Sequence, residues 1–412
     1  MGKLMKIAVR NLLRYKRRTL LTTFLITIGV VFVLVFISVS GSFKAMMIGQ
    51  ITDSMIGHLQ VHRKGYVASI DSLPLNLNLQ AGAMTRLEKI LDGRPEIESY
   101  SPRIKFGGMF SNFMETTNIR LNGVYPDREL QTVPLLASRV VNGAKNIEKG
   151  QIWVPELLAR GMKVKVGDVV VIVATNQDGS VNGRQLTVSG ILESATGPGG
   201  RDGYLHIADA MEILRMEERE ISEIAIRLKD FGKLHKVGMR LEGALAEELN
   251  QQGKPVFELH TWEKLSPFFN IARMIDVMTF FIKLMLIAIV LVSIMNVMIM
   301  AVYERIREIG TIAAIGTLPG RILSMFVLEG FCLGISGAFM GTITTVVIVS
   351  LLNLSAITFD FGQQKGLVLK AAMGPSDVLT ISVIVIIVSA IASLQPALKA
   401  SRMEPIKALR HV

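Results

Sequence analysis

Two long apolar runs flank a short charged segment, and this pattern constrains the fold of the chain more than any other feature. Residues 284–302 precede the segment and residues 325–352 follow it, and both runs are almost wholly hydrophobic. The segment itself has the sequence Y-E-R-I-R-E-I-G over residues 303–310. Because a bilayer core of about 30 Å takes roughly twenty apolar residues of helix, both runs predict membrane spans. The charged segment then predicts a short excursion out of the membrane.

Two further apolar runs, at residues 20–39 and 378–394, are also of span length. A cleaved signal peptide is the alternative interpretation of the first run, because small residues flank Val39. The run exceeds the roughly 7–15 apolar residues of a signal peptide, which favours an anchor. The sequence therefore predicts four transmembrane helices, at residues 20–41, 273–302, 322–352 and 377–395.

Lysine and arginine cluster beside the apolar runs and predict the topology. Residues 1–19 hold seven basic and no acidic residues. Their apolar residues recur at helical spacing, so we expect an amphipathic basic segment on the inner membrane surface. Residues 303–321 and 396–412 are also rich in basic residues. The positive-inside rule then places both termini and the 303–321 segment in the cytoplasm.

Residues 42–272 form a large block of balanced charge, with 27 basic and 27 acidic residues. The net charge of +11 therefore lies beside the spans, which argues against nucleic acid as a partner. The single cysteine, Cys332, excludes an intrachain disulfide. Alternating and helical patterns within the block predict an extracytoplasmic α+β domain inserted between the first two spans, and residues 353–376 predict an extracytoplasmic loop. We expect strands at 57–61, 118–124, 152–154, 168–174 and 185–192, a hairpin turn at 176–180, and helices at 83–91, 155–162, 207–215 and 233–251.

The chain lacks the motifs of common catalytic sites. It has no G-x-x-x-x-G-K-[ST] phosphate loop, so we expect ATP with Mg²⁺ to be bound by a partner subunit. His58 and His62 stand four residues apart on a predicted strand, a separation of about 13 Å. They are interpreted as a solvated strand face, and neither a metal site nor a cofactor site is predicted.

Three charged residues lie at the edges of predicted spans. Glu329 is interpreted as a paired group, with Arg321 or a backbone group as its partner, and a proton relay is the alternative. Lys283 is interpreted as an interface residue whose ammonium group reaches the polar region of the membrane.

The charged excursion predicts a short helix. Ile306, Ile309 and Ala313 recur at helical spacing, and Gly316 continues this thin apolar stripe. Gly316 and a following Pro-Gly pair are expected to end the helix before the third span. A short helix fused to two spans can transmit force from a soluble partner. A solvated connector is the alternative on pattern alone.

Several motifs resemble those of the MacB/FtsX-like ABC transporter permeases. Residues 304–316 are similar to the coupling pattern E-R-x-R-E-I-G-x-x-x-A-x-G of that family, and Glu329 follows at the head of the next span. Residues 396–410 are similar to the family's tail, which ends in A-L-R, and residues 8–14 are similar to its A-x-R-N-L-x-R opening. Short motifs between residues 57 and 168 are similar to the lipoprotein-releasing LolC/LolE branch.

The resemblance implies a second permease, alike or different, and a dimer of separate cytoplasmic ATPases. ATP-driven movement would pass through the excursion helix to the periplasmic domain, a process called mechanotransmission. The implied ATPase-coupling residues are Glu304, Arg305, Arg307, Glu308, Ile309, Gly310 and Gly316, with the tail residues Arg402, Pro405 and Arg410 beside them. The implied periplasmic partner loop holds Gly197, Pro198, Gly199 and Asp202, where the LolC-type members carry a chaperone hook, and this loop is short for a hook.

The resemblance implies a multi-pass inner-membrane permease without an ATPase site of its own. Its partners would include membrane lipid, a lipoprotein or hydrophobic substrate, and a periplasmic chaperone or adaptor. The expected function is lipoprotein release. The alternatives are MacB-like export of peptides or hydrophobic small molecules, and FtsX-like signalling to a cell-wall hydrolase. A membrane-anchored binding protein without a motor is the alternative from another class.

Overall fold

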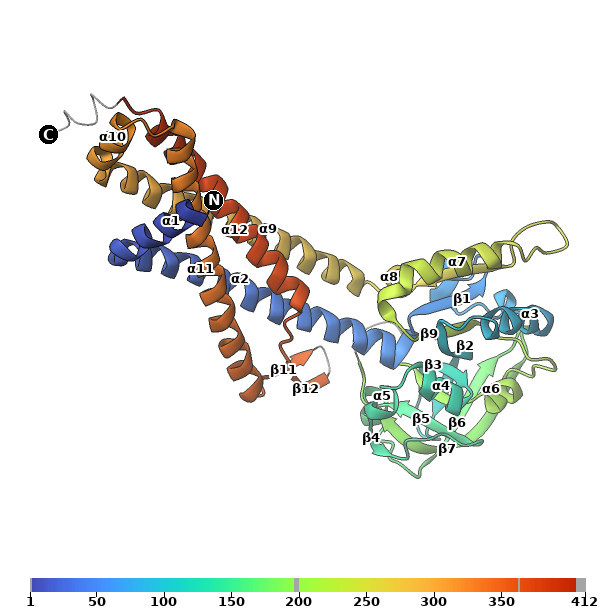
Figure 1. Ribbon diagram of the computed structural model, residues 1–412. Coiled ribbons are helices and arrows are strands. Elements are labelled where there is room, and N and C mark those ends of the chain that lie inside the picture. Colours follow the sequence, from blue (N-terminus) through green and yellow to red (C-terminus); the bar gives the residue numbers. More distant parts are fainter. Residues whose placement is uncertain (1, 196–199, 362–363, 405–412) are drawn as a thin grey trace. The chain divides into compact units, whose positions relative to one another are not determined.

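The computed structural model describes residues 2–195, 200–361 and 364–404 of the chain (Figure 1). These residues form two compact units. Residues 1–44, 273–358 and 368–412 make up the first, called here the helical unit. Residues 45–272, together with residues 359–367, make up the second, called here the sheet domain.

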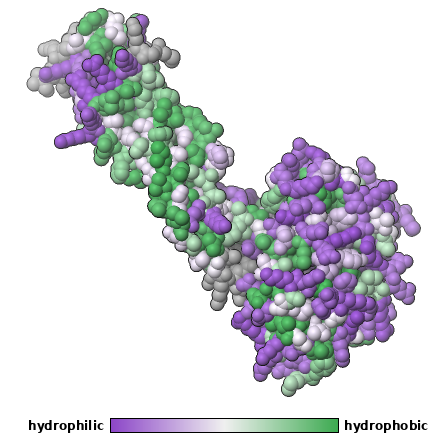
Figure 2. Space-filling view, turned by 60° about the horizontal axis from the view of Figure 1, so that its bottom comes forward, coloured by the Kyte–Doolittle hydropathy of each residue, from purple (hydrophilic) through white to green (hydrophobic). Residues whose placement is uncertain are grey.

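Among the described residues, four helices are long and apolar enough to cross a membrane, which confirms the four predicted spans. They are α2 (Lys16–Ile51), α9 (Phe268–Glu304), α11 (Pro319–Leu354) and α12 (Pro375–Ser401). Each extends beyond its apolar run, and the 36 residues of α2 span about 54 Å. Large apolar side chains such as Phe32, Phe281 and Phe339 are exposed on their flanks. Figure 2 shows hydrophobic residues over most of this visible flank, as a lipid-facing surface requires.

Glycines on α11 allow close packing of its neighbours. A Cβ at Gly330 would meet the side chain of Ser393 on α12 at 2.5 Å. A Cβ at Gly337 would meet the side chain of Ile26 on α2 at 2.4 Å. Small residues four apart let membrane helices approach each other closely, and Gly334 and Gly341 complete both pairs. The packing of α12 and of α2 therefore depends on two different faces of α11.

The remaining elements of the helical unit are short. Helices α1 (Gly2–Arg14) and α10 (Ile306–Ala314) lie before α2 and between α9 and α11. The segment predicted as an extracytoplasmic loop at residues 353–376 contains two short paired strands, β11 (Thr358–Phe361) and β12 (Gln364–Val368), and most of their residues belong to the sheet domain. Its strands are only four and five residues long, too short for an alternating pattern to stand out.

A ten-stranded mixed sheet forms the sheet domain, in the order β10-β1-β9-β2-β3-β8-β5-β7-β4, with β6 paired to β2 and β7. The predicted strands and the hairpin turn at residues 176–180 are present. The longest strand, at residues 97–111, was not predicted, because Pro102 and a Gly-Gly pair interrupt its pattern. The strands are β1 (Leu59–Arg63), β2 (Ile97–Ser111), β3 (Thr116–Val124), β4 (Val140–Gly143), β5 (Gln151–Pro155), β6 (Val169–Thr175), β7 (Val181–Leu192), β8 (Gly203–His206), β9 (Glu223–Leu228) and β10 (Phe257–Thr261).

Short helices cover the sheet. The α-helices are α3 (Ala81–Asp92), α4 (Pro126–Thr132), α5 (Glu156–Gly161), α6 (Ile207–Ile213), α7 (Leu234–Ala246) and α8 (Trp262–Leu265). A π-helix, η1 (Thr52–Ile56), follows α2, and four 3₁₀ helices are η2 (Val67–Ser72), η3 (Leu75–Leu77), η4 (Ala137–Arg139) and η5 (Phe231–Lys233). The helix predicted at residues 233–251 ends at Ala246, because the chain turns back to form a bridge between Leu249 and Pro255.

Candidate functional site

The charged excursion folds as α10, which confirms the predicted short helix. Arg305 directly precedes it, and Gly316 follows its last residue with a φ of +96°. This φ lies in the left-handed region, where residues with a Cβ are disfavoured. Pro319 then opens α11, a position in which its missing N–H costs no hydrogen bond.

Arg305 is buried and links α10 to α11. Its Nη1 donates to Glu329 Oε1 at 2.9 Å, and its Nε donates to Glu308 Oε2 at 3.2 Å. Its guanidinium also lies over the ring of Phe326, 5.5 Å from the ring centroid. Glu329 is therefore paired, as predicted, but its partner is Arg305 and not Arg321. Arg321 is exposed and eight residues earlier on the same helix, which is about 12 Å along the axis.

The N-terminal helices join the same site. Asn11 of α1 donates its Nδ2 to Glu329 Oε1 at 2.7 Å. Arg14 of α1 lies 3.3 Å from Glu308, and Arg18 of α2 lies 3.0 Å from Glu304. Three motifs that are far apart in the sequence, at residues 8–14, 304–310 and 329, thus meet in one network. We call Asn11, Arg14, Arg305, Glu308 and Glu329 the coupling network.

The coupling network divides the predicted ATPase contacts into two sets. Arg305 is 4% exposed and Ile309 is 2% exposed, and Gly310 is also buried. These three residues pack inside the helical unit, so their predicted part in coupling would be to hold α10 in place and not to present an exposed surface. Glu304, Arg307 and Gly316 are exposed, and Glu308 is partly exposed. Ile315 and Leu318, which the sequence did not single out, are 80% and 63% exposed beside them.

Other predicted site residues lie elsewhere. Lys283 is half-buried within α9, and Arg402 is exposed at the end of α12. Asp202 is 4% exposed and accepts a hydrogen bond from Asn122 at 3.3 Å, and its place in a periplasmic partner loop stays a prediction. It directly precedes β8, and its Oδ1 lies 3.6 Å from Arg120 of β3. Five predicted residues lie outside the described residues: Gly197, Pro198, Gly199, Pro405 and Arg410.

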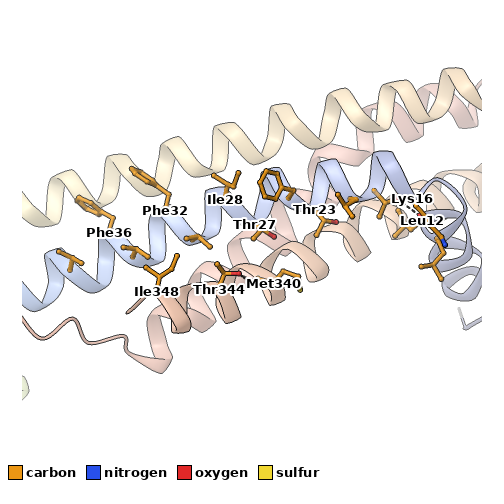
Figure 3. Close-up of a pocket in the computed structure, with 17 residues that line it drawn as sticks. Leu12, Lys16, Thr23, Thr27, Ile28, Phe32, Phe36, Met340, Thr344 and Ile348 are labelled. Carbon is orange, nitrogen blue, oxygen red and sulfur yellow. Dashed lines mark hydrogen bonds between the residues drawn. The ribbon is translucent and has the colours of Figure 1, made fainter. Parts of the chain in front are cut away.

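An apolar groove runs along α2 in the helical unit (Figure 3). Its volume is about 1220 Å³, and residues of α1, α2 and α11 line it. Phe32 and Phe36 project from α2, and Met340 and Ile348 from α11. A groove of this size and chemistry fits a hydrocarbon chain. Periodicity could not predict it, because groove-lining and lipid-facing residues are equally apolar.

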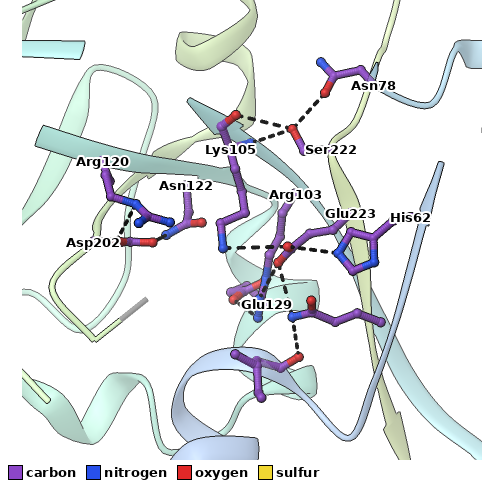
Figure 4. Close-up of polar contacts among 12 residues, drawn as sticks. His62, Asn78, Arg103, Lys105, Arg120, Asn122, Glu129, Asp202, Ser222 and Glu223 are labelled. Carbon is purple, nitrogen blue, oxygen red and sulfur yellow. Dashed lines mark hydrogen bonds and ion pairs between the residues drawn. The ribbon is translucent and has the colours of Figure 1, made fainter. Parts of the chain in front are cut away.

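A buried charge cluster lies on one face of the sheet (Figure 4). Glu223 of β9 lies 3.0 Å from Arg103 and 3.6 Å from Lys105, both on β2. Glu129 of α4 lies 2.7 Å from Arg103, and His62 of β1 lies 3.5 Å from Glu223. Burial alone raises the pKa of Glu223, but Lys105, His62 and Arg103 lower it below its ordinary value. The Glu223 carboxylate can therefore remain ionised without water.

His58 and His62 are buried inside the sheet domain, so their prediction as a solvated strand face is wrong. His58 is 4% exposed and His62 is 0% exposed. His58 Nε2 lies 3.3 Å from Asp53, and the ring of His62 stacks on Tyr66. Asp53 of η1 lies against His58 and Tyr66 lies against His62, and alternation along one strand cannot reveal such contacts. No group of metal-ligating side chains occurs among the described residues.

Both halves of this chain are similar in sequence to known protein families. The model of the MacB-like periplasmic core domain matches residues 19–244, and that of the FtsX-like permease C-terminal domain matches residues 280–405. The lipoprotein-releasing system transmembrane protein LolC of Neisseria meningitidis serogroup B is 22% identical, over 94% of this chain and 92% of its own length. LolE of Haemophilus influenzae is 22% identical, over 78% and 80%. The macrolide export ATP-binding/permease protein MacB 2 of Aeromonas hydrophila is 25% identical, over 98% of this chain and 60% of its own length.

Proposed function

Because this chain belongs to the MacB/FtsX-like family of ABC transporter permeases, we propose that it is the permease of a lipoprotein-releasing system. The chain is a multi-pass membrane protein of this family. A separate cytoplasmic ATPase dimer would bind ATP with Mg²⁺ and supply the energy. Both termini and α10 would face the cytoplasm, and the sheet domain would face the periplasm.

The Arg305–Glu329 contact carries the mechanical part of the proposal. It ties α10 to the interior of α11 through a pair that water does not reach. Asn11 of α1 donates a hydrogen bond to the same Glu329 carboxylate. Arg14 of α1 also forms an ion pair with Glu308 of α10. An ATPase that pushes on α10 would therefore move three helices together. Arg307, Ile315 and Leu318 are the exposed residues on which such a partner would act.

The lipoprotein substrate rests on two observations. LolC and LolE relatives cover most of this chain and most of their own length. The groove along α2 is apolar and has a volume of about 1220 Å³, which would hold an acyl chain of a lipid-modified protein. A second permease, which could be another copy of this chain or a different subunit, would complete the complex.

Purification of the full chain from its native membrane tests the proposal. An ATPase subunit should co-purify with the wild-type chain and be lost from Arg307→Glu, because the charge on the exposed face of α10 is reversed. Lys229→Glu, an exposed change in the sheet domain, is the matched control and should retain the ATPase. If neither chain carries an ATPase, the protein does not work as an ABC permease.

Export with an adaptor is the second candidate function, and the MacB 2 relative favours it. The purified complex separates the two. Lipid-modified protein bound to the complex would support release of lipoproteins. An adaptor protein, found without lipid-modified protein, would support export. A cell-wall hydrolase in their place would support FtsX-like signalling.

A further inference from the structure

A cavity of about 830 Å³ lies at the end of β1 in the sheet domain. Four cationic side chains line it: Arg63, Lys64, Arg86 and Lys254. None of the described residues that line it is acidic. A concave surface with charges of one sign concentrates the field, and so raises the local concentration of oppositely charged groups. The permease function proposed above makes no use of this cavity.

The four cations are only partly neutralised by the protein. Arg86 pairs with Glu248 at 2.9 Å. Arg63 donates to two backbone carbonyls, those of Asn76 at 3.1 Å and Asn78 at 3.4 Å, which hold it in place without cancelling its charge. Lys64 and Lys254 are exposed and form no ion pair with the described residues. Three positive charges are therefore left to a partner.

The first turn of α3 adds backbone donors to the same cavity. Gln80, Gly82 and Ala83 line it, and Gln80 occupies the N-cap position of this twelve-residue helix. The Gln80 side chain makes no capping hydrogen bond to the described residues. The first N–H groups of a helix need acceptors from outside the helix, and its N-terminus favours negative charge. Carboxylates and phosphates are the groups that such a terminus binds.

A buried amide points to the same ligand chemistry. Asn78 lines the cavity and is 2% exposed. Its Oδ1 accepts from Ser222 at 2.9 Å, while its Nδ2 has no hydrogen-bond partner among the described residues. Figure 4 shows the Nδ2 end turned away from Ser222. A buried donor without an acceptor is costly, so an incoming acceptor would be stabilised here.

We propose that this cavity binds an acidic peptide segment of a soluble partner protein. The arginines and lysines would form charge-assisted hydrogen bonds with aspartate and glutamate carboxylates of this segment. Gln251 and Gln252 at the rim have side-chain amides that both donate and accept, as the peptide groups of an extended segment require. A lipid headgroup would also supply an anion, but it lacks the repeated peptide groups that would form hydrogen bonds with these side-chain amides.

Gly82 provides the sharpest test, because its substitution separates helix stability from ligand binding. A Cβ at Gly82 would meet no described atom within 4 Å. Asp in the first turn stabilises a helix through its dipole. The same carboxylate would occupy the anion site and repel the ligand. Gly82→Asp should therefore keep or raise the melting temperature and weaken peptide binding at least tenfold, while Gly82→Asn should bind nearly as well as wild type.

The probe is a fluorescein-labelled octaglutamate peptide, titrated against the full chain in nanodiscs by fluorescence anisotropy. Lys64→Gln combined with Lys254→Gln should weaken binding about tenfold, because two exposed charges are lost. This difference from wild type should be smaller at high salt, because salt screens exposed charges. Lys229→Gln, also exposed in the sheet domain, is the control and should leave binding unchanged. Equal binding by wild type and Gly82→Asp would overturn the proposal. An equal loss in Lys229→Gln would overturn it as well, and so would displacement of the fluorescent peptide by glycerol phosphate but not by unlabelled octaglutamate.

Discussion

Replacing Glu329 with Gln tests whether the buried ion pair holds α10 to α11. Arg305 is 4% exposed and Glu329 is 0% exposed, so water cannot solvate the guanidinium after its partner is neutralised. Removing one partner of a buried pair costs about 3–5 kcal/mol. Arg305 retains its 3.2 Å contact with Glu308, a residue that is 40% exposed, so we expect a loss near the lower end, about 3 kcal/mol.

The free energy of unfolding of the full chain, measured by SDS titration in mixed micelles, gives this loss directly. A double variant, Arg305→Met with Glu329→Met, should recover most of it, because an apolar pair leaves no buried charge. Arg14→Met is the matched control. It breaks the ion pair of a 66% exposed arginine, and should cost less than about 1 kcal/mol. A Glu329→Gln loss as small as that of the control, or a double variant as unstable as Glu329→Gln, would refute the reasoning.

Three further outcomes are expected. Gly337→Val should separate α11 from α2 and lower the unfolding midpoint in SDS, because its Cβ would lie 2.4 Å from a side chain, whereas Gly320→Val has no described atom within 4 Å of its Cβ and should be mild. The folded pKa of Glu223 lies below its ordinary 4.5, so the stability that this carboxylate supplies is complete above that pH and is lost as pH falls below it. Circular dichroism melts should therefore show that the melting temperature falls on acidification, and that it falls less in Glu223→Gln than in wild type. Thr344→Phe should narrow the groove and reduce the lipid-modified protein recovered with the complex, while Ile343→Phe, outside the groove, should not.

Local sequence patterns were sufficient for the spans, the short helix and the tight turn. The four apolar runs predict helices because each run alone has the transfer free energy to enter a membrane. Gly316 predicts the end of α10 because its left-handed φ depends only on adjacent residues. The strand at residues 97–111 was missed because local breakers mark it as irregular, and only pairing with three neighbouring strands makes it continuous.

The contacts that define the candidate site required tertiary structure. Glu329 and Arg305 were both recognised as candidate residues, but their pairing joins two helices across a fold that brings in α1 as well. His62 follows a strand pattern that is the same whether or not another element covers its face, and only the packing of Tyr66, His260 and Glu223 around it decides that it is buried.

By itself, the sequence determined how many times this chain crosses the membrane, where it returns to the cytoplasm in the proposed topology, and where a neutral domain is inserted. These features depend on the partition of short segments between water and hydrocarbon, which each segment determines alone. The tertiary structure decided which charge neutralises which, because that choice depends on distance and burial between segments hundreds of residues apart. Asn11 and Glu329 are 318 residues apart in sequence and 2.7 Å apart in space.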